Sequence, residues 1–220
     1  MEKMQKAGVQ FGYSHTRRHP SAIPFIGSSK NRTDLFDLTK TKTALDKARE
    51  FVSKITNEGK IILFVGTKPE SRQIVKDAAN KLKQPFVTNR WIGGTLTNLP
   101  EIRKRVARLK ELRESKQSGE LEKKYTKKEQ LLFAREALRL EENFGGIIDM
   151  EKIPGALFII DSKHEDTAVR EARQLKIPVI SVSSSDCDLS LIDYPIPAND
   201  AATSSINLLT AEIASAYSAK

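Results

Sequence analysis

The sequence has little cysteine and no long apolar run. Its 220 residues include one cysteine, Cys187, which excludes a disulfide framework and suits a reducing compartment. No apolar run approaches the ~20 residues of a membrane-spanning helix, and the opening MEKMQKAGVQFG lacks the apolar region of a signal peptide. We expect a soluble protein of the cytoplasm that does not contact membranes.

Acidic residues are scarce over the first two-thirds of the chain. Residues 1–142 hold 31 lysines and arginines against 17 acids, whereas residues 143–220 hold 6 against 11. The net charge of +9 is therefore unevenly distributed, which indicates a polyanionic partner on one side of the molecule. Nucleic acid is the partner that we favour; the alternative is a soluble domain that happens to be basic. The acidic last third should face solvent or a neighbouring protein, because it would repel phosphate.

A strand, a helix and a strand follow one another between residues 60 and 98. Residues 61–65 are an unbroken apolar run, typical of a strand covered on both faces. Apolar residues then recur at helical spacing from 74 to 82, and the short stretch 85–88 favours a strand. This order predicts a parallel sheet with right-handed crossovers.

The same order returns near the end of the chain. Strands are predicted at 155–161, 178–182 and 192–196, with helices at 165–175 and 199–219. Earlier, residues 33–38 are typical of a first strand, and the helix that follows should end at Gly59, which suits a C′ cap. The sequence therefore predicts an α/β core formed by residues 33–100 and 143–220.

The segment 101–142 has a different composition, with 22 charged residues in 42 positions. Its apolar residues nevertheless recur at helical spacing on both sides of a break at 118–119: Ile102, Val106, Leu109 and Leu112 before it, Leu131, Ala134 and Leu138 after it. Two helices with narrow apolar seams predict a coiled-coil hairpin that is inserted into the α/β core and projects from it.

Residues 1–32 show no helical or strand period, and we expect a basic N-terminal arm that is extended or laid over a surface. Arg17 and Arg18, beside His15 and His19, suit phosphate binding, and Phe11 or Tyr13 is near enough to stack on a base. A partly disordered terminus is the alternative. A metal site on the two histidines would need partner ligands that the arm does not offer at metal spacing.

Basic residues also gather where the helical insertion begins. Arg103, Lys104, Arg105 and Arg108 form a cluster close in sequence to Arg90, which suits bidentate phosphate binding. The alternative is a solvated helix face. The neighbouring Trp91 could stack on a base, although packing of its loop onto the core is the interpretation that we favour. Gly93 and Gly94 are expected to allow a backbone conformation that side chains forbid.

Two turns at the carboxyl ends of predicted strands could belong to an enzyme. Residues 66–68 form a strand-to-helix turn without the glycine pattern of a nucleotide site, so we expect an ordinary turn or one in which Lys68 contacts an RNA phosphate. After the later strand, Asp186, Asp188, Asp193 and Asp200 could hold a divalent cation, but such residues more often cap turns. Cys187 has no histidine close in sequence to activate it.

Several motifs resemble the bacterial small-subunit ribosomal protein S two family. They are GVQFGYSHTRRHP, FVGTK, NRWIGGTLTN, LFIIDSKHEDTAVREARQLKIPVI and IDYPIPANDAATSSI, in that order over nearly the whole chain. The resemblance implies a Rossmann-like α/β domain with a protruding coiled-coil hairpin. It also implies a non-enzymatic place on the small ribosomal subunit, in contact with ribosomal RNA, neighbouring ribosomal proteins and, in some bacteria, ribosomal protein S one.

The chain departs from the family pattern in two places. Tyr13 stands where the family usually has histidine. After the late strand, Ser184-Ser185-Asp186 stands where the family usually has an Asp-Thr-Asn-type run, and Asn199-Asp200-Ala201 stands where it usually has a paired aspartate. We expect these changes to weaken or remove any metal or polar cluster built from those positions.

Our prediction is therefore a structural component of the small ribosomal subunit, ribosome-bound in the cytoplasm. We expect no catalytic residue, bound metal or cofactor. The rivals are a nucleotide- or metal-using α/β enzyme and a free regulatory RNA-binding protein. The residues expected to contact RNA are Arg17, Arg18, His19, Lys30, Arg32, Lys68, Arg90, Arg103, Lys104, Arg105 and Arg108.

Overall fold

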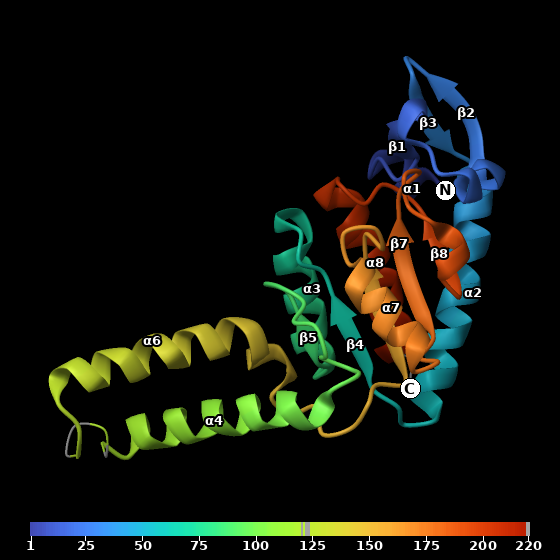
Figure 1. The fold of residues 1–220 in the computed structure, drawn as a ribbon. Helices are drawn as coiled ribbons and strands as arrows, with labels where there is room; N and C mark the ends of the chain where they lie inside the picture. The colour runs from blue at the N-terminus through green and yellow to red at the C-terminus, as the bar shows by residue number, and fades with distance from the viewer. Residues whose placement is uncertain (120, 122–123, 219–220) are drawn as a thin grey trace.

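The computed structural model describes residues 1–119, 121 and 124–218 (Figure 1). Its centre is a five-stranded sheet in which every neighbouring pair is parallel, with the order β5-β4-β6-β7-β8. The strands are β4 (Ile62–Val65), β5 (Phe86–Val87), β6 (Ala156–Ile160), β7 (Val179–Ser183) and β8 (Tyr194–Pro197). The predicted parallel α/β architecture is confirmed.

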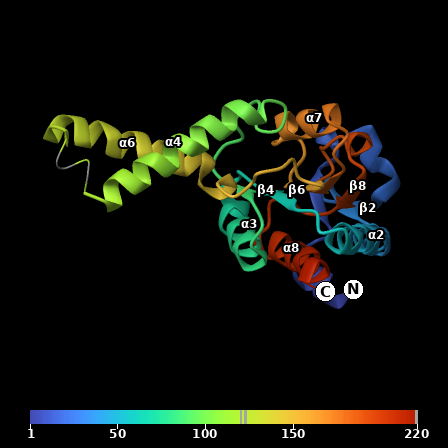
Figure 2. The same cartoon turned by 90° about the horizontal axis from the view of Figure 1, so that it is seen from below.

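Helices cover both faces of this sheet, as Figure 2 shows end-on. One face carries α2 (Leu38–Asn57), α3 (Pro69–Leu82) and α8 (Thr203–Ser218), which pack on residues such as Phe64. The other carries α7 (Asp166–Gln174), the start of α4 (Leu99–Gln117) and the end of α6 (Lys127–Phe144), packed on residues such as Leu63. Burial on both faces explains why β4 and β6 are continuous apolar runs.

Helix α2 begins and ends where local chemistry predicts. The Asp37 side chain accepts a hydrogen bond from the backbone N–H of Thr39 at 2.9 Å, which caps the first turn. Past the last turn, Gly59 has a φ of 67°, the left-handed conformation of a C′ glycine. The predicted end of this helix is confirmed.

The first 36 residues are more regular than the sequence predicts. They contain α1 (Glu2–Lys6), β1 (Phe11–Ser14), η1 (His15–Arg17), η2 (Pro20–Phe25), β2 (Ile26–Lys30) and β3 (Thr33–Phe36). The three strands form a separate antiparallel sheet of order β1-β3-β2. The expectation of an extended arm or surface loop is therefore wrong, and the predicted strand at 33–38 belongs to this sheet. Backbone pairing stabilises it, because most β2 side chains are exposed and leave no apolar period.

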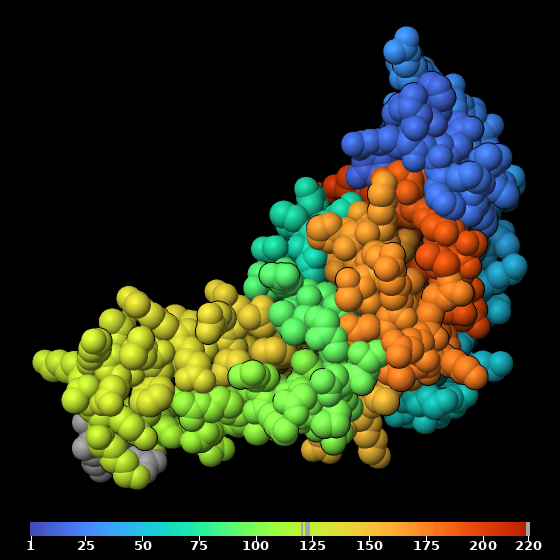
Figure 3. Space-filling model, viewed as in Figure 1, coloured from blue at the N-terminus to red at the C-terminus, as the bar shows by residue number. Residues whose placement is uncertain are grey.

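Helices α4 and α6 lie side by side and project from the sheet (Figures 1 and 3). The predicted seam of α4 is confirmed, since Ile102, Val106, Leu109 and Leu112 are all buried. The predicted seam of α6 is wrong, because the side chains of Leu131 and Leu138 are 52% and 65% exposed. The buried or half-buried apolar side chains of α6 are Phe133, Ala137, Leu140 and Phe144. Two apolar periods share this helix, and the sequence alone does not decide which one meets α4.

Within the described part of the chain, none of the helices has the length and apolar character needed to cross a membrane.

Candidate nucleic-acid interface

Three cations point to solvent in and beside the antiparallel sheet near the N-terminus. Lys30 ends β2, and Arg32 lies in the tight turn between β2 and β3, where Asn31 and Arg32 adopt φ values of 50° and 62°. Arg17 is exposed in η1, with its guanidinium carbon 5.8 Å from the centre of the Tyr13 ring. These three side chains are available to an external anion.

Arg18 and His19 instead bind within the molecule. The Arg18 guanidinium makes a two-pronged contact with the fully buried Asp34 carboxylate, with Nε to Oδ2 at 2.8 Å. The contact with Arg18 holds the pKa of Asp34 below its usual value. The backbone N–H of His19 donates to the carbonyl of Ser185 at 2.8 Å, and its Nδ1 lies 3.7 Å from the Asp188 carboxylate. Both residues therefore fasten the N-terminal segment.

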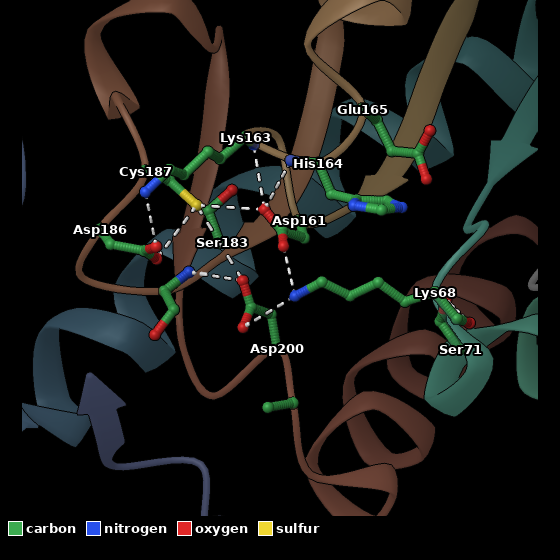
Figure 4. A network of polar contacts seen from close by, with 12 residues as sticks. Lys68, Ser71, Asp161, Lys163, His164, Glu165, Ser183, Asp186, Cys187 and Asp200 are labelled. Carbon is green, nitrogen blue, oxygen red and sulfur yellow. Dashed lines mark hydrogen bonds and ion pairs between the residues drawn. The ribbon is translucent and has the colours of Figure 1, made fainter. Parts of the chain in front are cut away.

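Lys68 lies inside a polar cluster at the carboxyl end of the parallel sheet (Figure 4). Its side chain is only 16% exposed, and its ammonium pairs with the Asp161 carboxylate and lies 3.6 Å from Asp200 Oδ1. The backbone N–H groups of Lys163 and His164 each donate to Asp161 Oδ1 at 3.0 Å. We expected the departures from the family pattern to weaken such a cluster, yet Asp200 takes part in one.

Burial and ion pairing act in opposite directions on the pKa values of this cluster. Burial, together with repulsion from Asp161, raises the pKa of Asp200 to about 7. Although burial disfavours its ammonium, the carboxylates of Asp200 and Asp161 hold the pKa of Lys68 above its usual value. Lys68 therefore supplies the positive charge that compensates the Asp161 and Asp200 carboxylates.

The four aspartates that were considered as metal ligands do not converge. Asp186 binds Lys163 Nζ at 2.9 Å, Asp188 caps the short helix η4 (Leu189–Leu191), and Asp193 accepts from the backbone N–H of Val179. Among the described residues, the set close enough to share an ion is Asp161, Cys187 and Asp200. The Lys68 ammonium contacts both of those carboxylates.

Cys187 is not placed to act as a nucleophile. Its thiol is buried and donates to Asp161 Oδ1 at 3.4 Å. Burial, followed by repulsion from the Asp161 and Asp200 carboxylates, raises its pKa to about 12. The thiol therefore stays protonated at neutral pH.

The N-terminal segment closes over this end of the sheet. The backbone N–H of Tyr13 donates to Ser185 Oγ at 2.9 Å, and the Asn199 side chain donates to the carbonyl of Gly8 at 3.1 Å. A Cβ on Gly12 would lie 2.9 Å from Ser185 Oγ, so glycine is needed for this close approach. Contacts between segments more than 170 residues apart thus join the antiparallel sheet to the α/β core.

A second group of cations lies where α4 begins. Arg103, Lys104 and Arg105 are exposed in its first turns, and Arg90 is exposed in the loop that precedes it. Lys104 pairs with Glu101 at 2.6 Å, but both side chains remain largely exposed. Arg108 differs, because its guanidinium binds Glu136 of α6 at 3.2 Å and Glu111 at 2.9 Å.

The loop before α4 is organised by a buried acid that the sequence analysis missed. The Glu171 carboxylate accepts hydrogen bonds from Trp91 Nε1 at 3.0 Å and from the backbone N–H groups of Gly94, Leu96 and Thr97. Trp91 is 8% exposed, which confirms that it packs the loop onto the core. The sequence contained a sign of this role, because Glu171 interrupts the inward apolar face of the helix predicted at 165–175.

The chain is similar to known proteins over nearly its whole length. The family model described as Ribosomal protein S2 matches residues 4–219. This chain belongs to the ribosomal protein S2 family. It is 42% identical over 216 residues to the small ribosomal subunit protein uS2 of Mycobacteroides abscessus, covering 98% of this chain and 78% of the relative. Its identity to the protein of the same name from Rhodococcus erythropolis is 44%, over 98% of this chain and 75% of the relative.

Membership of this family confirms the resemblance carried by NRWIGGTLTN and the other motifs.

The cations predicted to bind RNA fall into three groups. Some are exposed near the N-terminus, some are exposed near the start of α4, and the others bind residues inside the protein. Figure 1 shows that the antiparallel sheet and the α4–α6 pair extend from opposite ends of the molecule.

Proposed function

We propose that this protein is a structural, non-enzymatic constituent of the small ribosomal subunit in the cytoplasm, where it binds ribosomal RNA. The observation that carries the proposal is family membership over nearly the whole chain, with relatives that are named as small-subunit proteins. The excess of cations over the first two-thirds of the chain supports it.

The exposed cations are the proposed RNA contacts. Those near the N-terminus are Arg17, Lys30 and Arg32, and those near α4 are Arg90, Arg103, Lys104 and Arg105. Because side chains cannot read the deep major groove of an RNA helix, we expect recognition by shape and by phosphate contacts. Both groups can then touch RNA while the sheet between them stays covered by its helices.

Four of the predicted contacts have internal roles in this proposal. They are Arg18, His19, Lys68 and Arg108, whose charged or polar groups bind other residues of the chain. A cation that already pairs with a buried carboxylate would leave that carboxylate unpaired if it moved to a phosphate, which is costly.

We also propose that α4 and α6 form a coiled-coil hairpin spanning 101–142, inserted in a core of residues 33–100 and 143–220 that follows an N-terminal basic segment of residues 1–32. The buried seam of α4 and the ion pair between Arg108 and Glu136 support a close helix pair. Neighbouring ribosomal proteins are further proposed partners, ribosomal protein S one among them.

Sedimentation through sucrose gradients tests the proposed function. At low salt, the protein from a cell extract should migrate with the small subunit, and it should be released as salt rises because phosphate contacts weaken. A protein that stays at the top of the gradient at every salt concentration would contradict the proposal. RNA binding by that unassociated protein would instead favour a free regulatory role.

A further inference from the structure

Helix α6 carries an exposed apolar stripe on the side turned away from α4. The stripe consists of Leu131, Ala134 and Leu138, which follow one another at steps of three and four and therefore share one face. The side chains of Leu131 and Leu138 are 52% and 65% exposed, and Leu132 at the edge of this face is 55% exposed. Leucines at helical spacing on a projecting helix are typical of a surface that a partner covers.

The charges around the stripe have mainly one sign. Lys127, Lys128, Arg135 and Arg139 are exposed on α6, and among the described residues none of them forms an ion pair. The acids Glu136 and Glu141 do not offset them, since they bind Arg108 and Arg113 of α4. Glu142, four residues after Leu138, is an exposed acid on the same face, and the four cations outnumber it. A partner that covers the stripe would therefore meet cations that have no intramolecular partner.

We propose that the α6 stripe is a docking surface for an amphipathic helix of a neighbouring ribosomal protein, with acidic residues beside its apolar face. The 3-4 spacing of the stripe fits the apolar seam of a third helix laid along α6. Acidic side chains on that helix would complement the α6 cations. This inference rests on the proposed function, because it takes the partner from the same particle.

The apolar content of the surface favours a protein helix over RNA. Phosphates would neutralise Lys128, Arg135 and Arg139, but an RNA backbone offers little apolar surface for Leu131 and Leu138 to bury. A second copy of this chain is also a poorer partner, since its own α6 stripe would bring the same four cations face to face.

Photocross-linking in assembled subunits tests this surface. The full chain with Leu138→p-benzoylphenylalanine is incorporated into small subunits, irradiated, treated with ribonuclease and mapped by mass spectrometry. The same probe at Glu114, an exposed position on α4, serves as the control. We expect a ribonuclease-resistant cross-link from position 138, and not from position 114, to one ribosomal protein at a helix with acids beside its apolar residues.

Variants then show whether the leucines hold that helix. With the probe moved to Ala134, the double change Leu131→Asp and Leu138→Asp should lower the cross-link yield roughly tenfold or more. The change Ile153→Asp, at a position outside α6 that is 49% exposed, should leave the yield unchanged. Because all three changed side chains are exposed, circular dichroism of each variant should match that of the wild type.

The outcomes separate this inference from the proposed function. Subunits that contain the chain but give cross-links from position 138 to RNA, to a second copy of the chain or to nothing would overturn the docking surface alone. Absence of the wild-type chain from subunits would overturn both.

Discussion

Buried carboxylates stabilise turns of this protein, and each of them accepts hydrogen bonds from several donors. Glu171 accepts from the Trp91 indole and from three backbone N–H groups, and Glu165 accepts from the backbone and hydroxyl of Thr67 at 2.8 and 2.6 Å. A buried charge is tolerated where hydrogen bonds replace its hydration. The acidic last third of the chain is therefore partly internal, which corrects the expectation that it faces solvent or a neighbouring protein.

Asp200→Asn should change the pH dependence of stability. Burial and repulsion from Asp161 raise the pKa of Asp200 from 3.8 to about 7, so between those values the folded state binds more protons than the unfolded chain. The free energy of unfolding should then fall as pH rises across that window, by on the order of 2 kcal/mol from this group. Asparagine can still accept from the N–H of Ser184 but has no charge to bury.

Urea unfolding near pH 5 and near pH 8 measures this effect. The wild type should lose stability between the two conditions, and the Asp200→Asn variant should lose less. Lys68, Asp161 and Asp186 also act on this carboxyl, and they stay in place in both proteins. An equal loss in both proteins would contradict the assignment.

Glu171→Gln should loosen the loop around Trp91. The amide keeps one acceptor oxygen and turns two donor hydrogens toward N–H groups, so part of the hydrogen bonding of Gly94, Leu96 and Thr97 is lost. We expect the free energy of unfolding to fall by about 1–3 kcal/mol. Trp91 is the only tryptophan, so its emission should shift to longer wavelength as the indole meets water. An unchanged spectrum and unfolding midpoint would show that the loop does not depend on this carboxylate.

At the scale of elements, backbone conformation decides which turns tolerate side chains. The two glycines of the NRWIGGTLTN segment differ, although the sequence predicts special conformations for both. Gly94 has a φ of 90°, and a Cβ there would lie 3.2 Å from Asn98 Cβ. Gly93 has no such φ, and a Cβ would meet nothing within 4 Å. The prediction holds for Gly94 and is wrong for Gly93.

Gly94→Ala and Gly93→Ala are therefore a matched pair. The first should lower the free energy of unfolding by about 1 kcal/mol or more, because alanine is strained at positive φ. The second should change it by no more than about 0.5 kcal/mol. Equal destabilisation of the two variants, measured by urea unfolding, would contradict this account of the loop.

At the scale of the whole molecule, the elements that bury apolar surface on both faces were the predictable ones. Strands β4 and β6 are continuous apolar runs, β7 is buried along its whole length, and the order of these strands and their helices in the chain predicts the parallel sheet. The antiparallel sheet was not predictable, because backbone pairing rather than apolar burial holds β2. The seam of α6 was misassigned since two apolar periods compete on one helix, and only contact with α4 selects one.

The position of the polar cluster was considered in the sequence, but its contacts were not predictable. The turns after β4 and β7 were considered together only as the site of a rival enzyme, and the structure places Lys68 from the first turn and Cys187 from the second in contact with Asp161. The sequence gives no sign that Lys68 pairs with Asp161, which lies 93 positions away, or that Arg18 pairs with Asp34. Long-range pairing of this kind removes both cations from the set that can reach RNA.

Hydroxyl-radical footprinting of ribosomal RNA in small subunits tests the central claim most directly, namely that two separate groups of exposed cations bind RNA. We predict two protected regions in the presence of the wild-type chain. Lys30→Glu with Arg32→Glu should remove one protection, and Arg103→Glu with Arg105→Glu should remove the other. Loss of the same region in both variants, or protection that survives in both, would contradict the account.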